Sequence, residues 1–165
     1  MAQFFQITVN EILSGISRAI YEEYGSTLSI YKEKQEYLEL PGVCIYCVDY
    51  EKVMGRSDRF TNTFNIIINY FPEESNIINN NRPQMFTEAE RIMNAIKYIT
   101  LPAYKRDENG DLVETKLLNR AQDLMVEEQE EFIQISATYT VRTKEVIDIC
   151  KMAQLETDVT HKSGG

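Results

Sequence analysis

Histidine and cysteine are scarce in this chain, and their scarcity excludes several kinds of catalytic and structural site. The single histidine, His161, stands near the C-terminal end of the sequence, so a catalytic triad built on an imidazole is nearly excluded. Three cysteines are too few for a disulfide scaffold, and their odd number fits a reducing compartment. Cys44 and Cys47 match C-x-x-C, but on a strand they point to opposite faces, so we expect small packed side chains and no zinc or redox site.

Signatures of nucleotide, calcium and membrane binding are also missing. No Walker A or G-x-G-x-x-G motif is present. Residues 107–111 superficially resemble a calcium loop, but Leu112 and Leu118 stand where an EF-hand needs glycine and glutamate, so a hairpin turn is predicted. No apolar run approaches the ~20 residues of a transmembrane helix, and residues 1–6 do not begin a signal peptide. We expect a cytoplasmic protein with no metal and no cofactor.

Basic residues are in deficit, with 17 Lys and Arg against 26 Asp and Glu and a net charge of -9. Adhesive binding to nucleic-acid phosphates needs clustered Lys and Arg, so sequence-specific nucleic-acid binding is not expected, although DNA could slide past such a surface. The acidic run 127–131 could supply paired carboxylates, but a solvated strand tip is the stronger interpretation. Nothing in the sequence predicts an enzyme.

The strongest pattern in the chain is a long β-hairpin from Val43 to Phe71. A polar turn, Glu51 to Asp58, separates its two strands. The second strand alternates with a period of two and could cross the whole domain, so it needs a wide sheet or a neighbouring subunit to cover it. Its predicted core face holds Phe60, Phe64, Ile66, Ile68 and Tyr70, and its polar face holds Thr61, Thr63, Asn65 and Asn69.

Helix and turn signals complete the fold prediction. Capping boxes at Thr8 with Glu11 and at Thr87 with Glu90 begin two helices, the first ending at Tyr24 and the second closed by 101–102. Short strands are predicted at 28–31, 103–106, 112–115, 121–127 and 132–143, and a third helix at 145–155. Together these predict an α+β domain: a mostly antiparallel twisted sheet with two to three helices packed on one face. We assign residues 1–156 to this single domain and 157–165 to a flexible tail.

This order of parts resembles the tail-terminator, or tail-completion, family of phages and prophages with long tails of the contractile type. The likeness covers residues 8 to 143 and continues through the second half of the chain. It is carried by the capped first helix, the strand 28–31, the Pro41-Gly42-Val43-Cys44-Ile45 entry, the Gly55-Arg56 turn, the Phe60-to-Ile66 strand and Tyr70-Phe71-Pro72. The acidic tip 127–131 and the extension after Lys144 depart from typical members.

The resemblance implies a structural virion protein without catalytic activity. Family members form a hexameric ring that caps the tail tube, ends tube and sheath polymerisation and presents a surface to the neck. The implied partners are further copies of this chain, the tube protein, the sheath protein and a neck or connector protein, in a virion assembled in the host cytoplasm. DNA would pass through the ring.

Contacts with a neighbouring subunit or partner are expected at the two polar hairpin ends. The candidates are Glu51, Arg56, Asp58 and Arg59 in the central turn, and Glu128 and Glu130 in the acidic tip. Two alternatives stay open: a head-to-tail joining or neck ring protein, and a small cytoplasmic adaptor.

Overall fold

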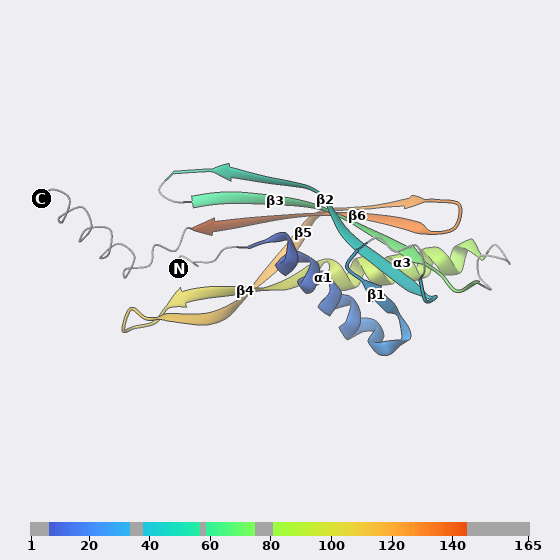
Figure 1. Ribbon diagram of the computed structural model, residues 1–165, viewed down its shortest axis with the longest axis horizontal. Coiled ribbons are helices and arrows are strands. Elements are labelled where there is room, and N and C mark those ends of the chain that lie inside the picture. Colours follow the sequence, from blue (N-terminus) through green and yellow to red (C-terminus); the bar gives the residue numbers. More distant parts are fainter. Residues whose placement is uncertain (1–6, 34–37, 57–58, 75–80, 145–165) are drawn as a thin grey trace, which may run out of the picture.

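The protein folds into one six-stranded sheet with two helices, as a computed structural model of residues 7–33, 38–56, 59–74 and 81–144 describes it (Figure 1). The strand order is β1-β2-β3-β6-β5-β4, and every pair is antiparallel except β1 with β2. The elements are α1 (Val9–Tyr24), a 3-10 turn (Gly25–Thr27), β1 (Ser29–Tyr31), β2 (Gly42–Met54), β3 (Arg59–Phe71), α3 (Arg82–Ile96), β4 (Tyr98–Arg106), β5 (Leu112–Glu128) and β6 (Ile133–Lys144). The predicted α+β class is confirmed.

The predicted long hairpin is present, but its turn is shorter than the sequence indicated. β2 and β3 pair from Gly42 opposite Phe71 to Met54 opposite Phe60. Glu51 therefore lies inside β2 opposite Thr63 and not in a turn. The low strand propensity of Glu and Lys gives way here to pairing along the full length of β3.

One face of the sheet forms the core with the two helices. Tyr139 on β6 is fully buried beneath α3, and its hydroxyl donates to the carbonyl oxygen of Ile96 at 2.6 Å. Burial raises the pKa of the Tyr139 phenol, so it remains a protonated donor. The buried residues of this face and its helices include Phe64, Ile66, Ile68, Tyr70, Ile133, Ile135, Ile12, Ile16, Ile20, Ala89 and Ile92.

The outer end of this core face departs from the predicted apolar row. Phe60 is only half-buried, with the Lys52 ammonium 4.3 Å from its ring centre. The buried residue next along the row is Asn62, whose amide nitrogen donates to the Thr143 hydroxyl at 2.9 Å and whose oxygen accepts from Tyr50 at 3.1 Å. The core therefore ends in a hydrogen-bonded polar cluster that the alternation of the sequence did not predict.

The helix predicted to begin at Thr87 begins at Arg82, so the prediction of a capping box at Thr87 and Glu90 is wrong. Pro83 stands in the first turn, where its missing N–H costs nothing, and the Thr87 hydroxyl donates to the Pro83 carbonyl at 2.9 Å from inside the helix. The helix ends at Ile96, before the predicted 101–102. Ile99 and Leu101 belong to β4, because their spacing also fits a strand that packs on α1.

Two short predicted strands, 112–115 and 121–127, are parts of one long strand, β5. Its first half pairs with β4 and its second half with β6, with a register shift between Ala121 and Asp123. The sheet consequently forks. Figure 1 shows the β4–β5 hairpin and the β2–β3–β6 strands as separate arms at one end, and the β5–β6 turn at the other. The third helix predicted at 145–155 and the tail 157–165 lie outside the described residues, and the domain limits 1–156 stay a prediction.

The first helix is built as the sequence predicts. Thr8 and Glu11 form the capping box, with the Thr8 hydroxyl donating to the Glu11 carboxylate at 2.6 Å. Gly15 is buried on the side that meets β4, where an added Cβ would lie 3.2 Å from the Thr100 carbonyl oxygen. The absence of a side chain at Gly15 therefore sets how closely α1 approaches the strand.

Candidate assembly surfaces

The predicted contact residues fall into two groups at opposite ends of the molecule (Figure 1). Glu51, Arg56 and Arg59 lie at the free end of the β2–β3 hairpin, and all three are exposed. Within the described part of the chain, neither arginine takes part in an ion pair. Asp58 lies outside the described residues. A role for this end in binding a neighbour stays a prediction.

The acidic tip between β5 and β6 carries the second group. The Glu128 carboxylate forms an ion pair with Arg82 in the first turn of α3, so this residue has an internal partner that holds the tip to the helix. A backbone bond from Gln129 N to the Phe132 oxygen at 3.0 Å closes the turn. Glu130 is exposed and is the better candidate of the two for contact with another protein.

The sheet face opposite the helices is polar, and in the described part of the chain no helix packs on it (Figure 1). Its side chains are half-buried by one another and bond across strands: Thr138 donates to Asn65 at 2.9 Å, and Thr140 to Gln122 at 2.9 Å. We call this surface, with Thr61, Thr63 and Ser136, the bare face. Alternation in the sequence predicted it, although Asn69, at its β1 end, is buried.

The outer half of β2 is exposed on both sides, which sequence reasoning missed. β1 pairs only with Gly42 to Cys44. From Val48 to Met54 every residue is exposed, Val48 at 62% and Met54 at 75%. Propensity and alternation identified the strand, but they carry no information on its position at the border of the sheet.

The two remaining motifs behave as predicted. Cys47 lies opposite Ile66 on the helix side and Cys44 opposite Asn69 on the other, so the thiols point apart. Burial raises the pKa of the Cys47 thiol, which keeps it unreactive. In the β4–β5 turn, Asp107 accepts from two backbone N–H groups at 2.9 Å and Gly110 has φ 84°, the geometry of a hairpin turn.

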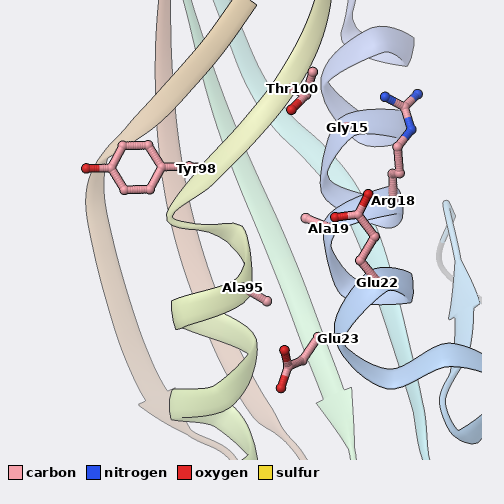
Figure 2. A pocket seen from close by; sticks show the side chains of 8 residues that line it. All are labelled: Gly15, Arg18, Ala19, Glu22, Glu23, Ala95, Tyr98 and Thr100. Carbon is pink, nitrogen blue, oxygen red and sulfur yellow. The ribbon is translucent and has the colours of Figure 1, made fainter.

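A small open pocket lies between α1, the end of α3 and β4, with a volume of about 210 Å³ (Figure 2). Arg18, Glu22 and Glu23 stand at its α1 side, while the Tyr98 ring points away from it. Among the described residues no group of three His, Cys, Asp or Glu side chains is placed to hold a metal ion. The pocket brings together no pair of groups that resembles an acid–base or nucleophilic site.

A polar cluster joins the two helices. The Tyr24 hydroxyl donates to Glu88 at 2.7 Å, and Arg91 Nε donates to Glu23 at 2.7 Å with its guanidinium 4.2 Å from the centre of the Tyr24 ring. Burial and the Glu88 carboxylate raise the pKa of Tyr24, and burial raises that of neighbouring Tyr70 to about 12. Both phenols therefore stay protonated at neutral pH, and the cluster is a structural bridge between α1 and α3.

Comparison with known proteins gives the family. Residues 11–150 match the model of a family described as phage tail terminator protein. The chain belongs to this family. No match was found among curated proteins. The terminator is thus a structural component of the tail end that interacts with other tail proteins, and its family is structural rather than enzymatic. Within the described residues, no helix has the length and apolar character needed to span a bilayer.

Proposed function

We propose that the terminator forms a homohexameric ring that caps the tail tube, ends its polymerisation and presents a joining surface to the neck. In a contractile tail, the same ring stops the sheath. The bare face is the observation that carries this proposal. Strands β2, β3, β6 and β5, which in the described part of the chain carry helices on one side only, suit a wall between an outer shell and an inner channel.

The side chains of the bare face suit a channel through which DNA moves. Thr, Asn, Ser and Gln cover its middle with hydroxyl and amide groups, which do not retain phosphates as clustered Lys and Arg would. By the strand register, Asp49, Glu51, Asp123 and Glu127 share this face. The described arginines on the same face are Arg59 and Arg142, both toward the free end of the β2–β3 hairpin, so acidic groups outnumber them. Negative charge repels the DNA backbone, so the DNA passes through the channel without adhering to its wall. We therefore orient the bare face to the lumen and the helices outward.

The two ends of the molecule then form the two rims of the ring. One rim carries the β2–β3 and β4–β5 turns, and the other carries the β5–β6 tip. One rim meets the last layer of tube protein and the other meets the neck or connector protein. Separate rims for separate partners explain why polar hairpin ends project from the sheet in both directions.

A tube-capping experiment tests the proposal. Purified terminator added to polymerising tube protein is expected to shorten the tubes and to appear as a ring at one tube end in negative-stain images. Deleting its gene should give overlong tails. Tails of normal length detached from heads would instead identify a joining ring, and a monomer without effect on tube length would contradict both readings.

A further inference from the structure

We infer that neighbouring copies in the ring join by pairing the outer edge of β2 in one copy with the outer edge of β5 in the next. The inference rests on the proposed ring and names the surface that builds it. The partner is a second copy of this chain, and the contact is a backbone ladder that continues the sheet from copy to copy.

The β2 edge is long and open. Beyond Cys44, no strand in the described part of the chain pairs with the outer side of β2, although the strand continues to Met54. Val48, Tyr50, Val53 and Met54 are exposed there by 43% to 75%. An edge of unpaired N–H and C=O groups beside exposed apolar side chains is a template for another strand.

A second open edge lies on the other border of the same sheet. β4 follows β5 only as far as Arg120, and Ala121 N makes a last bond to the Lys97 oxygen at 2.8 Å. From Gln122 to Glu128, β5 pairs with β6 on one side, and on its other side the described residues provide no strand. Met125, exposed by 67%, lies on this segment.

The strand directions make these two edges complementary. In the order β2-β3-β6-β5 every neighbouring pair is antiparallel, so β2 and β5 run in opposite directions. Copies related by rotation about the ring axis would bring β2 beside the next β5, and the antiparallel alternation would continue. Pairing of β2 with a second β2 would close a twofold dimer and leave the β5 edge open, whereas contact between two different edges generates a ring.

The curvature of the sheet favours the same closure. Both edge strands carry an irregularity at nearly the same level, between Cys47 and Asp49 in β2 and between Ala121 and Asp123 in β5. Extra residues of this kind bend a strand and increase its local twist. Curved sheets are what a closed wall of strands requires.

The two end strands of the sheet are poorly suited to such pairing: β1 spans only Ser29–Tyr31, and β4 contains a proline. Pro102 in the centre of β4 has no N–H to donate, and proline within a sheet is found on edges, where it blocks further pairing. The Thr100 carbonyl lies against α1, 3.2 Å from the position of a Cβ at Gly15. These features leave β2 and β5 as the matched pair.

Photocross-linking of the full chain tests this interface. p-Benzoylphenylalanine replaces Val48 on the β2 edge, which the strand register places level with Asp123 and Leu124 of β5, and a matched variant carries it in place of Tyr104 on β4. Each variant is assembled from a mixture of ¹⁴N- and ¹⁵N-labelled chains, checked for rings by native mass spectrometry, irradiated and mapped by fragmentation. The Val48 probe is expected to reach residues 122–128 of another copy, and the Tyr104 probe is expected to reach neither β2 nor β5 of a neighbour.

The outcomes separate this interface from the proposed function. Intact rings in which the Val48 probe reaches β2 or β4 of a neighbour, or no neighbour at all, would overturn the β2–β5 pairing alone. Rings with the expected cross-link that do not shorten tubes would refute capping and leave the interface standing. A chain that is monomeric at every concentration would overturn both.

Discussion

The two faces of the central sheet are formed by the same strands, because successive residues along each strand point to opposite faces. On the helix side, Phe64 lies opposite Tyr139 and both are fully buried; on the bare face, Thr63 lies opposite Thr140 and both are half-buried. The helix side supplies the free energy that folds the monomer. The bare face contributes little to it, so its side chains are free to suit a channel wall. In the proposed ring, alternation along each strand would thus separate the residues that fold the monomer from those that face the channel.

Deleting a large side chain on the helix side should have the largest effect on stability. Phe64→Ala is expected to lower the free energy of unfolding by about 3–5 kcal/mol, because it leaves a cavity beneath the helices. Thr63→Ala, one residue away on the bare face, should change it by no more than ~0.5 kcal/mol. Urea denaturation followed by circular dichroism measures both. Equal losses from the two variants would refute the separation of the faces.

Charge reversal at the free hairpin end should affect assembly and leave the fold intact. Arg56→Glu with Arg59→Glu is expected to weaken self-association and tube capping at least roughly tenfold, about 1.4 kcal/mol, because exposed cations there meet a neighbour. Lys116→Glu, an exposed cation on β5, is the matched control. Native mass spectrometry and tube lengths report the result. Unchanged assembly in the double variant would show that these arginines do not lie at a contact.

A substitution at Gly15, where α1 lies close to β4, should have an intermediate effect on stability. Gly15→Ala would ordinarily stabilise a helix by about 1 kcal/mol. Here the added methyl meets the Thr100 carbonyl, which the strand holds in place. We expect a net loss of about 1–3 kcal/mol, against almost no change for Ser17→Ala on the same helix. A higher melting temperature for Gly15→Ala would show that the helix can move away from the sheet.

Alkaline pH should weaken the helix side through its tyrosines. The folded-state pKa of Tyr70 is raised to about 12, and those of Tyr24 and Tyr139 are raised as well. The unfolded chain loses these protons near pH 10, so stability is fully present below that value and falls as pH rises through the window to about 12. Tyr139→Phe should make the fall shallower and cost about 1 kcal/mol at neutral pH through its lost bond to Ile96. Urea midpoints from pH 8 to 11 measure both effects.

Local features of the fold could be predicted from the sequence more completely than long-range ones. The Thr8 cap, the Asp107 turn and the alternation around Phe64 are short-range patterns, and each is present in the structure. The predicted helix start at Thr87 was wrong because a threonine three residues before a glutamate can stand at an N-cap or inside a helix. Only the bond from the Thr87 hydroxyl to the Pro83 carbonyl distinguishes the two positions.

Sheet borders follow from pairing between distant segments, which no local pattern encodes. The continuity of β5 from Leu112 to Glu128 depends on β4 and β6 each supporting half of it. The open half of β2 depends on β1 ending at Tyr31. Of the predicted contact residues, the structure gives Glu128 an internal partner and leaves Arg56 and Arg59 exposed, distinctions that composition alone could not make.

The most direct test of the account is an electron cryo-microscopy map of the terminator on a tail tube, at a resolution that traces strands. The expected map shows a ring whose lumen is lined by the bare face, with Thr63 and Thr138 toward the channel and α1 and α3 outside. A ring with helices facing the lumen, or with the bare face covered by another protein, would contradict it.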